Sequence, residues 1–251
     1  MRDRVYRAEA LILRRSDLGE ADRLLLLATP AGKRRVVAKG VRKTMSKLAG
    51  HVELFTHASL LLAIGRNLDH LTQSQTINAH STLRADLRRL SCAYYAAEIY
   101  DRFTLEEDES QALFALLIES FGALDRSGSP DLVLRAYELR LLHLVGYRPH
   151  LHYCAHCGTL LDETADRFSP TLGGVLCPRD RHADRNALAL GGPAFRLLRY
   201  LQGQPFAAIE HLHLSSQVRG EVEWLLRAYL RQLIERDLKS VAFLDDMKGV
   251  E

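Results

Sequence analysis

Three of the four cysteines lie close together in the middle of the chain. Cys154 and Cys157 are separated by two residues, and Cys177 follows after 19 more. A two-residue gap lets both thiolates of one turn reach a single ion, and zinc favours four tetrahedral ligands drawn from Cys, His and carboxylate. A second Cys-x2-Cys pair would end at Asp180, and His182 is chemically the better ligand. The spacing therefore predicts one Zn²⁺ held by Cys154, Cys157, Cys177 and His182, with Asp180 as the alternative fourth ligand.

The pattern around these cysteines favours a structural zinc over a catalytic one. A catalytic zinc keeps an open water position, and the sequence lacks a helical His-Glu-x-x-His and a His-x-Glu before the cysteines. P-loop, Gly-x-Ser-x-Gly and Gly-x-Gly-x-x-Gly motifs are also missing. We therefore expect a protein that is not an enzyme, with His156 pointing away from the ion. A metal-free loop with spare thiols and a zinc-dependent hydrolase are the alternatives.

The second chemical feature is a run of positive charge near the N-terminus. Residues 1–50 hold 13 Lys and Arg against 5 Asp and Glu, although the whole chain has a net charge of only +3. Residues 33–47 contain no acid, and such a run repels itself unless a polyanion is nearby. Nucleic acid is the natural partner, and a solvated basic face without a partner is the alternative. The residues expected to contact phosphate are Arg34, Arg35, Lys39, Arg42, Lys43 and Lys47.

Short apolar segments separated by turn signals surround this basic run. Strand-like patterns cover residues 4–15, 23–28, 33–40, 59–64 and 68–77. Five short strands in about 80 residues predict a small barrel, with the oligonucleotide-binding (OB) fold as the first candidate and an SH3-like barrel as the alternative. Residues 41–50 would then form a basic loop between the third and fourth strands, free to follow a phosphate backbone.

The rest of the chain reads as helical. Apolar residues recur at three- and four-residue spacing from about residue 81, and helices are expected at 81–97, 110–124, 131–145 and 218–234. The acidic residues 106–109 fit the first turn of the second helix, and Cys92 is expected to be a buried structural thiol. The predicted fold class is α+β. We expect an OB-fold barrel at residues 1–80, a helical domain at 81–150 and 190–251, and a zinc-binding element inserted at 151–189.

Composition places this chain among globular proteins. Of its 251 residues, 47% are hydrophobic and 26% are charged, which is enough apolar material for a sizeable core. No uncharged run approaches the roughly 18 residues of a membrane helix, and no secretory signal pattern follows Met1. We expect a cytoplasmic protein.

Several segments carry a family resemblance that spans nearly the whole chain in the right order. The chain is similar to the RecO family of bacterial recombination mediators in the segments Leu18-Gly19-Glu20-Ala21-Asp22-Arg23, Ala38-Lys39-Gly40-Val41-Arg42, Tyr137-Glu138-Leu139-Arg140-Leu141-Leu142, Gly146-Tyr147-Arg148-Pro149, Cys154-Ala155-His156-Cys157-Gly158, and Leu238-Lys239-Ser240 with Phe243-Leu244. The resemblance implies an OB-fold, a helical domain and a zinc element. Where that element is complete in the family it has four cysteines, so Asp180 leaves the ligand set open.

The resemblance also implies a set of partners. It implies binding to single- and double-stranded DNA, annealing of complementary strands, and, with RecR, loading of RecA onto DNA coated by single-strand-binding protein. It further implies that the helical domain docks the acidic, apolar C-terminal tail of single-strand-binding protein. Because guanidinium pairs bidentately with carboxylate, we expect Arg135 and Arg140 to bind this tail. The alternative function is an OB-fold and zinc-knuckle RNA-binding or transcription-associated factor, which only nucleic-acid preference and partners would distinguish.

Overall fold

The chain divides into two compact units. The computed structural model describes residues 5–46, 48–106, 109–209, 212–234 and 238–247. The first unit is Met1–Ala93 with Tyr100–Asp125, and the second is Tyr94–Ile99 with Arg126–Glu251. No helix within the described ranges is long and apolar enough to cross a bilayer.

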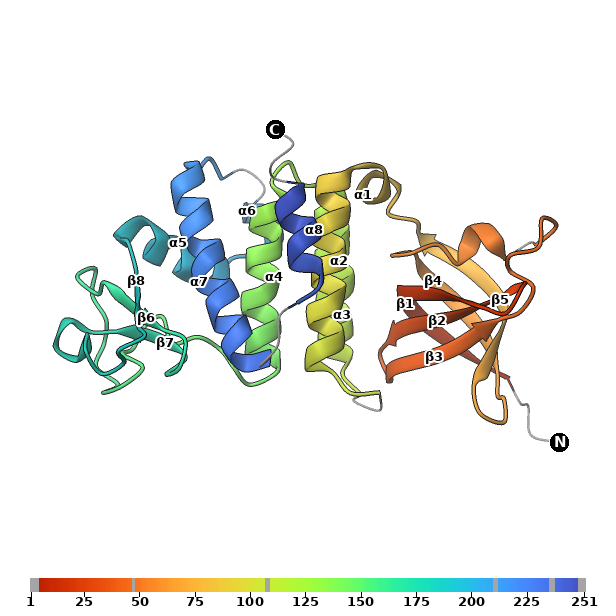
Figure 1. Cartoon of the computed structure of the whole chain (residues 1–251), viewed down its shortest axis with the longest axis horizontal. Coiled ribbons are helices and arrows are strands. Elements are labelled where there is room, and N and C mark those ends of the chain that lie inside the picture. Colours follow the sequence, from red (N-terminus) through yellow and green to blue (C-terminus); the bar gives the residue numbers. More distant parts are fainter. Residues whose placement is uncertain (1–4, 47, 107–108, 210–211, 235–237, 248–251) are drawn as a thin grey trace. The chain divides into compact units, whose positions relative to one another are not determined.

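Five strands of the first unit close into a barrel (Figure 1). They are β1 (Val5–Leu18), β2 (Asp22–Thr29), β3 (Gly32–Ala38), β4 (His57–Ala63) and β5 (Asp69–Asn78). The order around the barrel is β1-β2-β3-β5-β4, and β3 pairs with β5 in parallel while the other neighbours are antiparallel. This is the strand order of an OB-fold. The prediction of an α+β protein that begins with a five-stranded barrel is confirmed.

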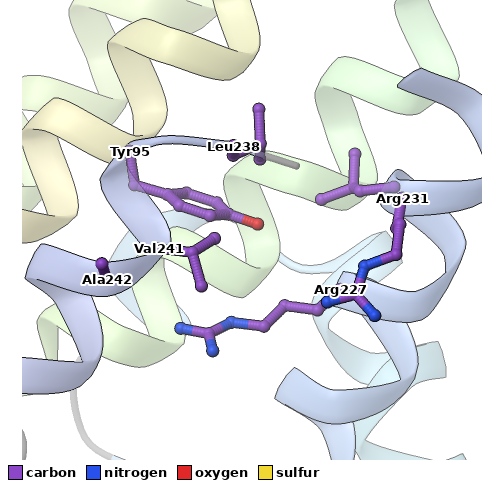
Figure 2. A pocket seen from close by; sticks show the side chains of 7 residues that line it. Tyr95, Arg227, Arg231, Leu238, Val241 and Ala242 are labelled. Carbon is purple, nitrogen blue, oxygen red and sulfur yellow. The ribbon is translucent and has the colours of Figure 1, made fainter. Parts of the chain in front are cut away.

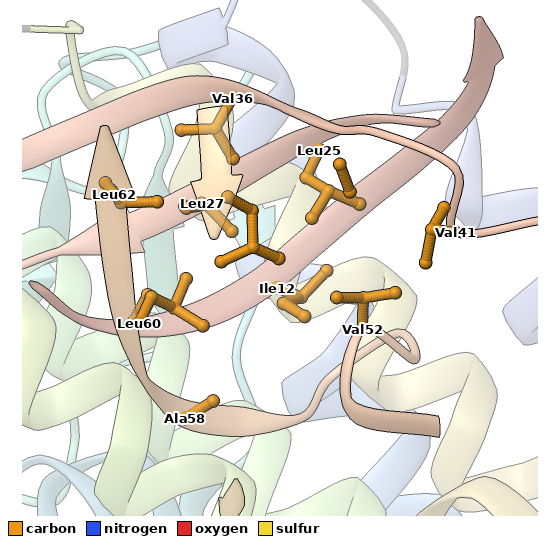
Figure 3. Packing of buried hydrophobic residues seen from close by; sticks show 12 residues of the cluster. Ile12, Leu25, Leu27, Val36, Val41, Val52, Ala58, Leu60 and Leu62 are labelled. Atoms are coloured by element: carbon orange, nitrogen blue, oxygen red, sulfur yellow. The ribbon is translucent and has the colours of Figure 1, made fainter. Parts of the chain in front are cut away.

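Alternate residues of each strand fill the barrel interior. On β2, Leu25 and Leu27 point inward, and Val36 of β3 and Leu60 of β4 meet them there (Figure 3). All four are almost completely buried. Side chains of a strand alternate between its two faces, so the residues between these positions face outward. Because the interior is packed with side chains, any ligand of the barrel must bind its outer surface.

Helices of the first unit pack against the barrel. These are α1 (Ser81–Ala85), the two ends of α2 (Leu87–Phe103) and α3 (Gln111–Arg126), while the middle of α2, residues 94–99, belongs to the second unit. The rings of Phe55 and Phe121 lie 5.3 Å apart, and the Ser110 amide donates to the Pro30 carbonyl at 3.1 Å. The Ser110 hydroxyl accepts from the Leu113 amide at 3.2 Å as α3 begins. The first turn of α3 contains no acid, so the prediction that residues 106–109 form that turn is wrong; residues 107 and 108 lie outside the described residues.

The second unit surrounds one central helix. Its helices are α4 (Pro130–Leu144), α5 (Gly192–Gly203), α6 (Phe206–Ile209), α7 (Ser216–Ile234) and α8 (Ser240–Asp246). Helix α4 packs against α5, α6 and α7 and is buried on almost every face. Between α4 and α5 the chain forms a small sheet in the order β7-β6-β8 from β6 (Arg167–Ser169), β7 (Gly174–Leu176) and β8 (Leu188–Ala189). This insertion carries the cysteine cluster.

Candidate metal centre and nucleic-acid interface

Two tight turns bring the cysteines together. In the first, the Cys154 amide donates to the Thr159 carbonyl at 2.8 Å, and the Gly158 amide donates to the Cys154 carbonyl at 2.9 Å. Gly158 has a φ of 72°, which glycine adopts without the steric cost of a Cβ. In the second, Cys177 follows β7, and a 3₁₀ turn, Pro178–Asp180, folds back so that the Asp180 amide donates to the Cys177 carbonyl at 3.0 Å.

Four potential ligand atoms meet where these turns face each other. One atom from each of Cys154, Cys157, Cys177 and Asp180 lies within 4.8 Å of the others. The Sγ atoms of Cys157 and Cys177 are 3.8 Å apart, and Asp180 Oδ2 lies 3.3 Å from Cys154 Sγ and 3.4 Å from Cys177 Sγ. A tetrahedral zinc with Zn–S of about 2.3 Å and Zn–O of about 2.0 Å requires roughly 3.8 Å between sulfurs and 3.5 Å between sulfur and oxygen. The donor set fits zinc in both chemistry and spacing.

Hydrogen bonds prepare two of these groups to bind a cation. Thiol hydrogen bonds from Cys157 and Cys154 lower the pKa of Asp180 to about 2, so its carboxylate is ionised. Burial raises the pKa of the Cys154 thiol, but backbone N–H groups, including that of Cys177 at 3.3 Å from the sulfur, outweigh it and the net pKa falls. Burial raises the pKa of Cys177. A metal ion would displace the remaining thiol protons, because only thiolates act as ligands.

The two histidines near this cluster behave differently from each other. His182 is exposed and does not belong to the group of four ligand atoms. His156 Nδ1 lies 3.5 Å from Asp180 Oδ2. The prediction that His156 points away from the site is therefore wrong, because the first turn carries its ring towards the Asp180 carboxylate.

Three exposed residues of the predicted DNA-binding set lie directly after β3. Lys39, Arg42 and Lys43 are all exposed within five residues of each other. Arg42 donates to the Gly19 carbonyl at 3.1 Å, which ties this segment to the turn between β1 and β2. Lys47 lies outside the described residues. Three exposed cations therefore lie close together in sequence, in the segment that connects β3 to β4.

The cations within β3 lie in different surroundings. Lys33 is buried, and its Nζ lies 2.6 Å from Asp101 Oδ1 in a pair that joins β3 to α2. Arg34 is half-buried, with its guanidinium near the Ala31 carbonyl at 3.5 Å. Arg35 points outward and its Nε donates to Glu106 at 2.7 Å. On β3, the buried Lys33 therefore stabilises the fold, whereas Arg35 is available to solvent.

The two arginines predicted to bind a partner do not share one surface. Arg135 is buried within the second unit, where its Nη1 lies 3.0 Å from Glu138 Oε1 and its guanidinium lies over the Tyr95 ring. Contrary to the prediction, it offers no guanidinium to a partner at the surface. Arg140 is half-buried and stacks over the Phe206 ring at 3.8 Å.

A pocket that the sequence patterns did not point to lies in the second unit. Its volume is about 300 Å³. Its walls come from α2, α7 and the segment around α8 (Figure 2), and the lining residues are Tyr95, Arg227, Leu230, Arg231, Leu238, Val241 and Ala242. Arg227 pairs with Glu223 and Asp245, each at 2.7 Å. Arg231, one turn further along α7, is exposed at the pocket. An apolar cavity with guanidinium groups at its wall suits an apolar group attached to an anion.

Comparison with known proteins assigns the chain to a family. Residues 84–242 match the family model described as Recombination protein O C terminal, and residues 1–80 match Recombination protein O N terminal. The DNA repair protein RecO of Roseiflexus sp. (strain RS-1) is 55% identical over 248 residues, covering 99% of this chain and 88% of that protein. The chain belongs to the RecO family. RecO proteins of Dehalococcoides mccartyi (strain BAV1) and Symbiobacterium thermophilum are 37% and 34% identical, over 97% and 98% of this chain and 96% and 98% of their own lengths.

Membership of the RecO family confirms the resemblance read from the sequence. The family consists of DNA repair proteins that act as recombination mediators without enzymatic activity. A RecO chain therefore needs surfaces that bind, rather than groups that make or break bonds. Among the described residues, the basic segment after β3 and the pocket beside α7 are the two candidates for such surfaces.

Proposed function

We propose that this protein binds single- and double-stranded DNA on the outside of its barrel and anneals complementary strands. With RecR, it would help to load RecA onto DNA coated by single-strand-binding protein. Annealing requires no bond chemistry, but two polyanions approach each other only when their charge is neutralised. The observation that carries the proposal is the group of exposed cations, Lys39, Arg42 and Lys43, beside a barrel whose interior is closed.

A salt titration of binding tests this proposal. We expect the double reversal Lys39→Glu with Lys43→Glu to weaken binding to labelled single-stranded and duplex DNA of any sequence, because phosphate contacts carry no sequence information. The slope of log affinity against log salt should become shallower by roughly one unit per lost contact. The control is Arg185→Glu with Arg196→Glu, which changes the net charge equally at two exposed arginines of the second unit.

Equal weakening by both double variants would show a general charge effect and contradict a site beside β3. A labelled RNA strand belongs in the same titration. Preference for RNA over both forms of DNA would favour the alternative function, an RNA-binding or transcription-associated factor.

We further propose that one structural zinc joins the two turns of the insertion, held by Cys154, Cys157, Cys177 and Asp180. Support comes from the ligand spacings, which match a tetrahedral ion. When bound, the ion would cross-link the two short turns that carry its ligands. It would do so without an open coordination position, and His156 would hold the Asp180 carboxylate from outside the ligand group.

We also propose that the pocket beside α7 receives the C-terminal tail of single-strand-binding protein. A tail of that chemistry has an apolar end that carries the terminal carboxylate, next to acidic residues. Leu230, Leu238 and Val241 offer an apolar wall, and Arg231 offers an exposed guanidinium at the same pocket. Arg231 is the candidate for the carboxylate, because its side chain is exposed and lines this pocket.

A fluorescent peptide with several acidic residues and a C-terminal phenylalanine tests this docking site. We expect binding near micromolar concentration, equivalent to about 8 kcal/mol, and loss of affinity when the terminal carboxylate is amidated. Arg231→Ala should weaken binding about tenfold, the effect of losing one charge-assisted hydrogen bond, while Arg196→Ala should not. If Arg140→Ala weakens binding and Arg231→Ala does not, the tail docks at α4 instead.

A further inference from the structure

The exposed cations on the barrel's outer face fall into two groups that differ in their present partners. Arg35 and Arg42 each face a carboxylate, whereas the ammonium groups of Lys39 and Lys43 form no hydrogen bond or ion pair with another residue in the described parts of the chain. Arg35 Nε lies 2.7 Å from Glu106 Oε1.

The Arg35–Glu106 ion pair is exposed to solvent, whereas the Lys33–Asp101 ion pair, which starts from the same strand, is largely buried. Both side chains of the Arg35–Glu106 pair are 55% exposed, whereas the Lys33 side chain in the Lys33–Asp101 pair is only 8% exposed. An exposed pair contributes at most about 1 kcal/mol, so a competing anion can displace it at little cost. The buried pair would leave an uncompensated charge if it broke. Of these two pairs on β3, the Arg35–Glu106 pair is therefore the one that can exchange its anion.

The second exchangeable pair links the basic segment to the end of β1. Arg42 Nη2 is 3.3 Å from Asp17 Oδ2 at the end of β1, and Asp17 is 57% exposed. The same carboxylate lies 3.5 Å from Arg23 Nε. Asp17 therefore neutralises part of the charge on two arginines of the barrel.

We infer that Glu106 and Asp17 set the strength of DNA binding by occupying arginine edges that a phosphate would use. This inference rests on the proposed DNA-binding function. Lys39 and Lys43 contact the phosphate backbone of the DNA first, and phosphates then replace the carboxylates at Arg35 and Arg42. A phosphate that displaces a carboxylate releases fewer counterions than one that meets a bare cation, so the gain in affinity is smaller. The two carboxylates thereby limit affinity, as suits a protein that must release the annealed duplex.

Two variants that neutralise a carboxylate test the inference, because it predicts that each will strengthen DNA binding. Glu106→Gln and Asp17→Asn remove the charge and keep the shape of each side chain. Each should tighten binding to a labelled single strand about threefold at low salt, the fold-change expected for one surface ion pair. Each should also steepen the salt slope by up to about one unit. The matched control is Glu163→Gln, an exposed glutamate paired with Arg196 at 3.5 Å in the second unit.

The outcomes separate this inference from the function on which it rests. Unchanged or weaker binding by Glu106→Gln and Asp17→Asn would overturn the inference, because the carboxylates would then be inert or would hold the arginines in their binding pose. An equal gain in Glu163→Gln would also overturn it, since net charge alone would explain the effect. In both cases the parent protein still binds DNA with a salt slope. A parent protein whose binding shows no salt slope would overturn the DNA-binding proposal itself and the inference with it.

Discussion

A buried carboxyl group in the second unit should make the stability of that unit depend on pH. Glu138 of α4 is completely buried, and this burial raises its pKa from 4.5 to about 7. The Arg135 guanidinium at 3.0 Å and the Tyr95 hydroxyl favour the ionised form, but they do not offset the loss of water. Of the two charged groups on α7 that face it, Glu223 raises its pKa further and Arg227 lowers it. Glu138→Gln is the perturbation, because glutamine has nearly the same shape and does not titrate.

The size and sign of the effect follow from proton linkage. Between the unfolded and folded pKa values, the folded state holds one more proton than the unfolded state, so stability falls as pH rises. The contribution is fully present below the unfolded pKa and is lost as pH rises through about 7. Each pH unit in this window is worth about 1.4 kcal/mol. From about pH 5.5 to pH 7, the parent protein should therefore lose about 2 kcal/mol relative to the Glu138→Gln variant.

Urea unfolding of both proteins at several pH values measures this difference. Trp224 is the single tryptophan of the chain and lies on α7, so its fluorescence reports on the unit that contains Glu138. Zinc is kept in excess throughout, and Glu163→Gln, at an exposed site, serves as the control with no expected slope. A free-energy difference that stays constant with pH would refute the reasoning. A difference that moves in favour of the parent as pH rises would show that Glu138 is ionised when buried.

Two further predictions concern the metal and the barrel core. One equivalent of zinc, measured by atomic absorption, should co-purify with the protein, and Cys154→Ser should lose both the zinc and stability. Asp180→Ala should retain less zinc than His182→Ala. The reverse order would identify His182 as the fourth ligand. Leu27→Ala should cost about 2–5 kcal/mol of unfolding free energy, because Leu27 is fully buried inside the barrel. Leu18→Ala, at a residue 42% exposed, should cost less than about 1 kcal/mol, and similar costs for both would mean that the barrel interior is loosely packed.

The barrel could be predicted from the sequence because its signals are local. Alternating apolar residues and turn signals placed all five strands within a few residues of their observed bounds. The helical stripe from Leu83 to Ala97 was less informative, because it continues through a break. Asp86 is extended (φ −109°, ψ 118°) and its side chain accepts from the Arg89 amide, so α1 ends and α2 begins there. An N-cap changes the backbone direction without disturbing the apolar spacing.

The candidate sites also differ in whether their signal is local in the sequence. The cysteines were found because a metal knuckle is encoded within a few residues, and the position of Asp180 follows from a single turn of chain. Arg135 was placed on a surface because arginines usually are, but α4 is buried on nearly every side and encloses it with Glu138. The pocket joins α2 to α7 and α8, which lie more than 100 residues later in the sequence. Only tertiary packing brings such segments together.

The basic run illustrates how charge density in a sequence differs from binding capacity in a fold. Residues 33–47 contain no acid, yet the fold supplies carboxylates from elsewhere in the chain to three of their cations. Asp101 neutralises Lys33 inside the unit, while Glu106 and Asp17 face Arg35 and Arg42 in solvent. Since affinity for a polyanion scales with the cations that release counterions, the number of Lys and Arg residues overstates it. The relevant quantity is how many cations remain unpaired and how readily the others exchange partners, and that quantity is set by residues outside the run.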